Sequence, residues 1–138
     1  MNQDVLLRKM ESLRRCLVRL EKKRPNSLEQ LVSDYDLQDI ICINLERAVQ
    51  LAVDLGLHLL VLSDIKPPAT MSEVFSSLAV EKIISPELAA KLKGAVGFRN
   101  IAVHEYEEIN WAIVSSILNG SLDDFRVFMA AILGKISL

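Results

Sequence analysis

An arginine and a histidine near the end of a predicted helix are the chain's clearest candidates for chemistry. Arg99 and His104 are five positions apart, a spacing that turns two side chains about 140° apart on an α-helix. The guanidinium of arginine matches the oxygens of a phosphodiester, and histidine accepts a proton near neutral pH. Because the 2′-hydroxyl of RNA is an internal nucleophile, two such helices packed across a two-fold axis could form a cleft that cleaves RNA without a metal ion.

The same pair also allows a simpler interpretation, in which Arg99 is a surface cation and His104 a capping or hydrogen-bonding side chain. Other catalytic patterns are missing: the sequence has no glycine-rich phosphate loop after a strand and no G-x-S-x-G motif. Two histidines and two well-separated cysteines cannot make a four-ligand Cys/His site within one chain. We therefore predict no metal ion and no cofactor.

Length and composition predict one globular domain over residues 1–138. The hydrophobic fraction of 51% excludes a disordered chain and is high enough that we expect a partner to cover some apolar surface. The charged N-terminus is unlike a signal peptide, and no uncharged apolar run is long enough for a membrane span, so we expect no membrane and a cytoplasmic location. Cys16 and Cys42 are expected to be small buried hydrophobic residues.

Charge is distributed unevenly along the chain. Residues 1–24 carry eight basic and three acidic side chains, whereas residues 25–138 carry eight basic and fifteen acidic ones. A basic strip beside an acidic body could guide a polyanion. A solvated helix face is the simpler explanation of the same strip.

Apolar residues at helical spacing predict an all-α chain without strands. The first helix has an apolar stripe with spacings of four and three: Leu6, Met10, Leu13, Leu17 and Leu20. Pro25 ends it, and a short helical turn is expected over residues 28–33. The longest helix, residues 35–64, is apolar over so much of its circumference that we expect it at the centre of the core or between subunits. Gly56 within it predicts a close helix crossing.

Capping residues mark the starts of the remaining helices, which follow a break at Pro67-Pro68. The expected starts are Thr70, Ser85, Asn110 and Ser121. The helix capped by Ser85 should run to about Tyr106. The helix capped by Asn110 should end near Leu118, because Asn119-Gly120 is a typical stop signal.

Several polar and aromatic residues of these helices allow two interpretations. Asp39, Glu46 and Asp54 on the longest helix could help to line a cleft, although solvated or ion-paired side chains are the simpler expectation. Tyr35 and Trp111 are expected to be packing residues, because so few aromatic rings make no obvious platform for stacking bases.

Residues 97–106, with the sequence GFRNIAVHEY, extend the Arg99–His104 pair into an R-x4-H-x-Y pattern that includes Tyr106. The pattern resembles the motif of the HepT family, which are toxins of the HEPN superfamily of helical ribonucleases. The resemblance covers nearly the whole chain. Further matching segments are residues 37–39, 44–45, 54–58, 67–68 and 73–75.

The resemblance implies an up-and-down helical bundle that forms a homodimer with its active cleft at the interface. Arg99 would hold the scissile phosphate of an RNA substrate, His104 would be the acid and base, and Asn100 would support the cleft by hydrogen bonding. The implied partner is an MNT-type minimal nucleotidyltransferase, the antitoxin of a type VII-like pair, which transfers AMP from ATP to Tyr106. The added bulk and negative charge would exclude RNA.

Two other functions remain open at this point. The chain could be a non-catalytic helical scaffold that presents substrate or nucleotide to the nucleotidyltransferase. It could also be a purely structural helical dimer, in which Arg99 and His104 pair with acidic residues across the interface.

Overall fold

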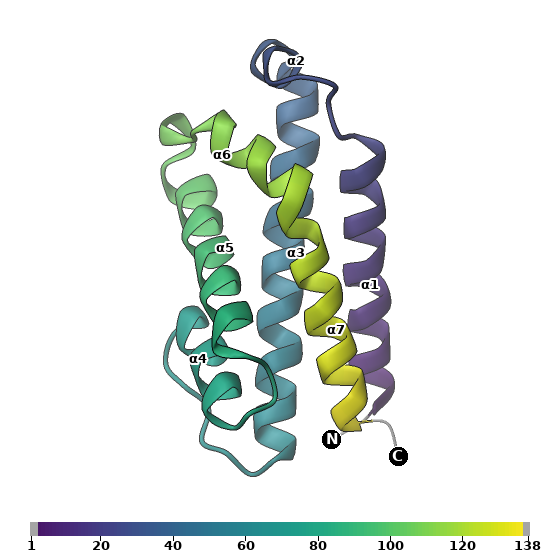
Figure 1. Ribbon diagram of the computed structural model, residues 1–138, viewed down its shortest axis with the longest axis vertical. Helices are drawn as coiled ribbons and strands as arrows, with labels where there is room; N and C mark the ends of the chain where they lie inside the picture. Colours follow the sequence, from purple (N-terminus) through teal and green to yellow (C-terminus); the bar gives the residue numbers. More distant parts are fainter. Residues whose placement is uncertain (1–2, 137–138) are drawn as a thin grey trace.

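The computed structural model describes residues 3–136, and within that range the chain is helical without any strand, as predicted (Figure 1). Short turns join the elements. Their bounds are α1 (Gln3–Lys22), α2 (Leu28–Ser33), α3 (Tyr35–Leu62), α4 (Met71–Val80), α5 (Pro86–His104), the 3₁₀ turn η1 (Tyr106–Glu108), α6 (Trp111–Ser116), the π-helical turn η2 (Ile117–Ser121) and α7 (Leu122–Ile136).

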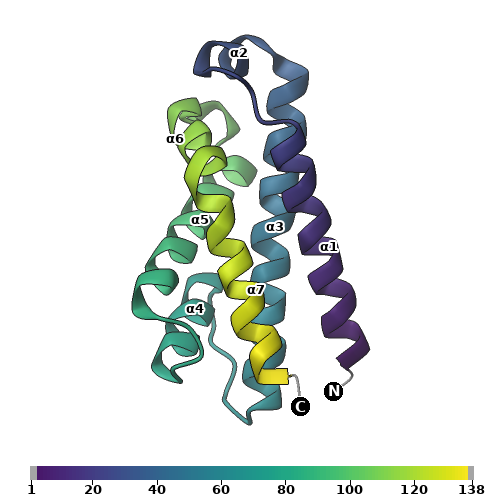
Figure 2. The same cartoon turned by 45° about the vertical axis from the view of Figure 1, so that its right-hand side comes forward.

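Four long helices, α1, α3, α5 and α7, alternate in direction along the long axis of the molecule (Figures 1 and 2). The described chain therefore begins and ends at the same end of the bundle, while α2 and α6 lie at the opposite end. The arrangement is the expected up-and-down bundle. Within residues 3–136, every helix is too short or too polar to cross a membrane.

Helix α3 occupies the centre, as its broad apolar circumference predicts. It packs against α1, α4, α5 and α7, and buried residues occur on several of its sides, including Ile41, Leu45, Leu55 and Leu60. Cys42 of α3 and Cys16 of α1 are both buried and unbonded, which confirms the expectation for the cysteines. Tyr35 is a correction: its side chain is 75% exposed at the start of α3, so it does not pack within the chain.

Gly56 lies where α3 crosses α4, which confirms the predicted close approach. A Cβ atom at this position would lie 2.7 Å from Cγ1 of Val74 and 3.0 Å from Cδ1 of Leu78. Both neighbours are fully buried, at 1% and 0% exposure. Since neither side chain has room to move, only glycine fits this crossing without a shift in packing.

Replacing Gly56 with alanine should therefore lower the free energy of unfolding by about 1–2 kcal/mol, because overpacking outweighs the helix propensity gained. The matched control is Gly94→Ala within α5, where a Cβ atom would have no neighbour within 4 Å. This control should raise stability by about 0.5–1 kcal/mol. Denaturant unfolding of both variants measures the difference, and equal shifts would contradict the close crossing.

Side-chain caps begin α4, α5 and α6 at the predicted residues, whereas the predicted start at Ser121 is wrong, because Ser121 lies within the helical turn η2. Ser27, Thr70 and Ser85 each accept a hydrogen bond from the backbone N–H three residues later, at 3.2, 3.3 and 3.1 Å. Asn110 accepts from two amides of α6. These bonds satisfy N–H groups that the first turn of a helix leaves without partners.

The end of α5 differs from the prediction. The helix ends at His104 and not near Tyr106, because Glu105 adopts a φ of −140° and Tyr106 begins the turn η1. Continuing the helix would place Glu105, Glu107 and Glu108 at its negative end, which is unfavourable. The shorter helix redirects Tyr106 toward α3.

The predicted stop at Asn119-Gly120 is wrong. The backbone stays helical through the wider turn η2 and continues into α7, and no glycine of the described chain has a positive φ. Val114, Leu118 and Leu122 are all buried at intervals of four residues. A π-helical turn, which holds more residues than an α-helical turn, keeps such a series on the inner face.

Candidate active site

The guanidinium group of Arg99 is partly buried on α5 and has few partners. Its Nη1 donates a hydrogen bond to Oδ1 of Asn100 at 3.3 Å, and its Nε is buried without an acceptor. Within residues 3–136, no carboxylate pairs with it. Since arginine has five N–H donors and a permanent charge, most of its capacity to bind an anion is unused. Asn100 is the side chain that accepts this hydrogen bond.

His104 is the last residue of α5 and is exposed. The helix closes beyond it by a hydrogen bond from the Glu105 amide to the carbonyl of Ile101 at 2.8 Å. Because α5 is continuous from Pro86, Arg99 and His104 lie on different sides of it, about 140° apart. A cavity of about 540 Å³ on α5 is lined by neither residue. One chain therefore does not bring the pair together in this cavity.

Tyr106 contacts a residue far away in the sequence. Its hydroxyl donates a hydrogen bond to Oδ1 of Asp39 on α3 at 3.0 Å. Its ring packs edge-to-face on Trp111, with 6.2 Å between ring centres, and Trp111 is thus a packing residue, as expected. The ring of Tyr106 is 40% exposed. These contacts fix the turn η1 against α3 while leaving part of the tyrosine accessible.

The surroundings of Tyr106 on α3 are acidic. Burial and the hydrogen bond to Asp39 raise the pKa of Tyr106 to about 12, with smaller contributions from Cys42 and from the charges of Asp39 and Glu46. Burial, together with the same two carboxylates, also raises the pKa of Cys42 to about 12. Asp39, Cys42 and Glu46 therefore share one side of α3 that faces Tyr106, and this side repels additional negative charge.

The phenol of Tyr106 should titrate near pH 12 in the folded protein, above its ordinary value of 10. Because the pKa of Tyr106 is raised on folding, its protonated phenol stabilises the folded state below about pH 10. This stabilisation is lost as the pH rises through about 12. Phenolate absorbance in a Tyr35→Phe background measures Tyr106 alone. Adding Asp39→Ala should move the midpoint toward 10, and an unchanged midpoint would contradict the contact.

Asp39 is the residue whose role the sequence did not reveal. It was expected to be solvated or ion-paired, yet it is the acceptor for Tyr106. Asp54 behaves as expected, because it pairs with Lys9 at 3.3 Å and accepts a hydrogen bond from Gln50. The only signal for Asp39 was its place in the matching segment 37–39, since its contact spans 67 positions.

Among the described residues, no group of three or more His, Cys, Asp or Glu side chains is arranged to hold a metal ion.

The bundle has the fold of HEPN toxins. It superimposes on a tri-AMPylated Shewanella oneidensis HEPN toxin, solved in complex with an MNT antitoxin, with a TM-score of 0.90 and 32% sequence identity. The alignment covers 97% of this chain and 99% of that one. Fold and sequence therefore agree over almost the full length of the toxin.

The chain belongs to the HepT-like ribonuclease family, whose profile, described as "Ribonuclease HepT-like", matches residues 6–132. It is similar to the mRNA nuclease HepT of Shewanella oneidensis, at 32% identity over 129 residues, which are 94% of this chain and 96% of that protein. It is also similar to a tRNA nuclease HepT of Aphanizomenon flos-aquae, at 29% identity over 124 residues, which are 90% of this chain and 84% of that protein.

Proposed function

We propose that this protein is a metal-independent RNA endonuclease and the toxin of a toxin–antitoxin pair. One observation carries the proposal: Arg99 and His104 lie on one continuous helix within the region that matches the ribonuclease family. The two curated relatives are both named RNA nucleases. Arg99 and His104 are the proposed catalytic residues, and Asn100 is the proposed support for Arg99.

The chemistry follows from the two side chains and from RNA itself. His104 accepts the proton of a 2′-hydroxyl, and the freed oxygen attacks the adjacent phosphorus. Arg99 binds the phosphate oxygens and stabilises the charge that builds on them. The bond from phosphorus to the 5′-oxygen breaks. The protonated imidazole of His104 from a second copy of the chain supplies the proton to that leaving group. The products are a 2′,3′-cyclic phosphate and a 5′-hydroxyl end.

The proposed active form is a homodimer with the cleft at its interface. The divergence of Arg99 and His104 on one helix favours this form, because a second copy of α5 can present its own His104 beside the first Arg99. Exposed apolar side chains also gather near these residues. They are Ile40 and Ile43 on α3, which follow the Tyr106 partner Asp39 by one and four residues, and Val103 beside His104. A dimer would cover this apolar surface.

The proposed antitoxin is an MNT-type nucleotidyltransferase that attaches AMP to Tyr106. The related toxin of known structure is AMPylated and bound to an MNT antitoxin. Tyr106 is two residues beyond His104 and partly exposed, so an added nucleotide would stand beside the proposed base. Its phosphate would repel the phosphates of RNA.

The test of this function is a cleavage assay with purified protein and a mixed-sequence RNA. We expect products with cyclic phosphate ends, formed at the same rate with and without EDTA. The 2′-O-methyl form of the same RNA should resist cleavage because it has no free nucleophile. Absence of cleavage, together with growth that continues after induction without the antitoxin, would overturn the proposal in favour of a non-catalytic scaffold.

A further inference from the structure

A groove of about 420 Å³ runs between α1 and α3, on a side of α3 other than the one that faces Tyr106. Its rim is basic: Arg15 and Arg19 come from α1, and Arg47 comes from α3. The remaining lining residues are Ser12, Cys16, Gln50 and Leu51. Helices α1 and α3 lie side by side in both views of the fold (Figures 1 and 2).

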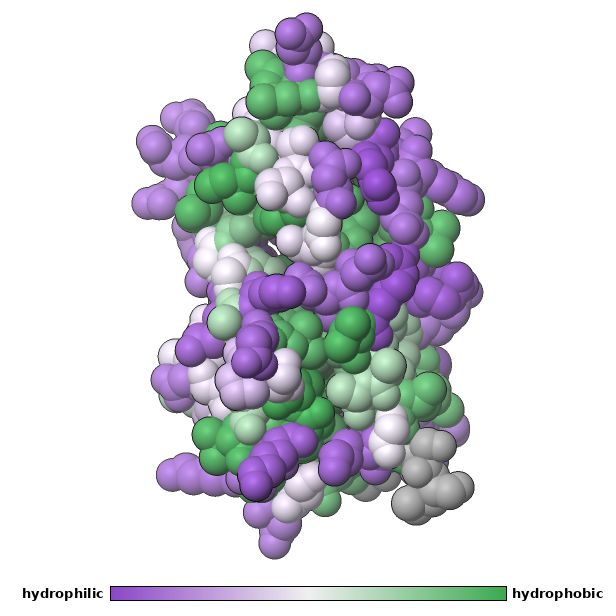
Figure 3. All heavy atoms as spheres, in the orientation of Figure 1, coloured by the Kyte–Doolittle hydropathy of each residue, from purple (hydrophilic) through white to green (hydrophobic). Residues whose placement is uncertain are grey.

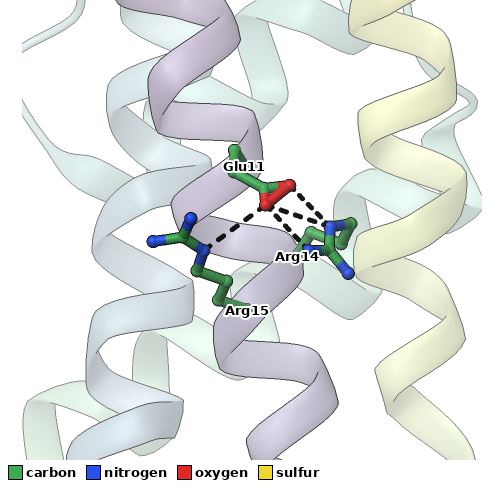
Figure 4. A network of polar contacts seen from close by, with 3 residues as sticks. All are labelled: Glu11, Arg14 and Arg15. Carbon is green, nitrogen blue, oxygen red and sulfur yellow. Dashed lines mark hydrogen bonds and ion pairs between the residues drawn. The ribbon is translucent and has the colours of Figure 1, made fainter.

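The arginines of this groove have little acid to neutralise them. Glu11 contacts Arg15 at 3.4 Å, but it also binds Arg14 through two shorter bonds of 2.6 and 2.8 Å. Figure 4 shows Arg15 directed toward α3, whereas Arg14 extends to the other side of α1, toward α7. Arg19 and Arg47 form no ion pair within the described part of the chain. The groove therefore has a net positive charge.

This concentration of positive charge contrasts with the rest of the molecule. Residues 25–138 carry fifteen acidic and eight basic side chains, so most of the surface repels a polyanion. Figure 3 shows hydrophilic side chains gathered over the upper half of α1, the half that carries Arg14 to Lys22. The groove is where this basic helix and an arginine of α3 converge.

We propose that the Arg15–Arg19–Arg47 groove binds the sugar–phosphate backbone of single-stranded RNA outside the catalytic cleft. The inference deepens the proposed function, since it names where the same substrate is held. Arginine forks bind phosphate oxygens in pairs. Arg15 and Arg19 are one helical turn apart on α1, so their Cβ atoms are about 5–6 Å from each other, and Arg47 faces them across the groove. A strand lying along the groove places its phosphates between Arg15 and Arg19 on one side and Arg47 on the other.

The groove lies next to the side of α3 that faces Tyr106. Arg47 directly follows Glu46, whose carboxylate acts on Tyr106 from the neighbouring side of α3. An RNA strand held in the groove is therefore kept beside the acidic side of α3, which repels its phosphates. Because arginine contacts to phosphates carry no sequence information, the groove is proposed to add affinity without selecting bases.

The experiment measures binding of a fluorescent 2′-O-methyl RNA to the full-length protein by anisotropy, over a range of salt concentrations. The variant Arg19→Gln/Arg47→Gln should weaken binding about tenfold or more at low salt. It should also reduce the slope of log affinity against log salt by about 1.4, the value for two lost single-strand phosphate contacts. The matched control, Arg8→Gln/Lys135→Gln, removes the same charge from exposed positions outside the groove and should bind nearly as wild type.

Equal affinity and slope in the two double variants would overturn the inference. So would normal RNA binding by the groove variant combined with weakened binding to the nucleotidyltransferase, since the groove would then be a protein-docking surface. The uncleavable RNA separates this test from the proposed function. If binding depends on the groove but unmodified RNA is not cleaved, the nuclease function is refuted and the groove inference is supported. If RNA is cleaved but binding does not depend on the groove, the nuclease function is supported and the groove inference is refuted.

Discussion

Replacing His104 with alanine should reduce RNA cleavage by at least about a hundredfold, because the reaction loses its proton acceptor. Arg99→Ala should cost at least as much, because the charge that develops on the phosphate loses its cation. Arg99→Lys should keep only part of the activity, since lysine retains the charge but not the fork. Gel electrophoresis of end-labelled RNA measures these rates, and growth after induction measures toxicity in cells.

His104 gives the cleaner of the two tests. Its side chain is exposed, and within residues 3–136 it makes no hydrogen bond or ion pair. Its removal should therefore change the free energy of unfolding by no more than about 0.5 kcal/mol. Circular dichroism and gel filtration should show the wild-type helical content and oligomeric state for both alanine variants. Wild-type cleavage rates in both would refute the assignment of the catalytic pair.

Incubation with the cognate nucleotidyltransferase, ATP and magnesium should add mass in units of AMP to the wild-type protein, and Tyr106→Phe should take up none. In the proposed transfer, the phenolic oxygen of Tyr106 would attack the α-phosphate of ATP, and pyrophosphate would leave. The proton can pass to Asp39, which already accepts it in a hydrogen bond of 3.0 Å. Peptide mass spectrometry locates the adduct, and the phenylalanine variant should remain toxic in the presence of the enzyme.

Tyr35→Phe is the matched control for this prediction. Tyr35 is 75% exposed, against 40% for Tyr106, so a transfer governed by access alone would favour Tyr35. We expect the Tyr35 variant to be modified and neutralised normally. Loss of the Tyr106 hydroxyl should lower the free energy of unfolding by about 0.5–1.5 kcal/mol, the net value of one hydrogen bond. An adduct on Tyr35, or on any residue other than Tyr106, would contradict the prediction.

Modification at Tyr106 also has a structural consequence at the contact with α3. An esterified oxygen cannot donate a hydrogen bond, so AMP transfer removes the bond to Asp39. The new phosphate charge would stand beside Asp39 and Glu46, which already disfavour negative charge at this position. Both effects weaken the attachment of η1 to α3. Because η1 begins two residues after His104, the change acts close to the proposed base.

The sequence by itself determined the helices and most of their starts. Side-chain caps such as Ser85 and Asn110 act on amides two or three residues away, and the apolar stripe of α1 repeats within one element. It also determined that Gly56 marks a close crossing, and the extended motif of residues 97–106, together with matching segments along the chain, indicated the family. All of these signals are carried by residues close together in the chain, where periodicity and capping are strong.

Only the tertiary structure decided the end of α5, the continuous path from α6 to α7, and the partner of Tyr106. Each depends on packing between distant segments: Asp39 and Tyr106 are 67 positions apart, and the basic groove joins Arg19 of α1 to Arg47 of α3. A local pattern specifies which face of a helix is apolar, but not which helix that face will meet. The free energy that fixes those choices comes from burial between elements, and it overrides a local stop signal such as Asn119-Gly120.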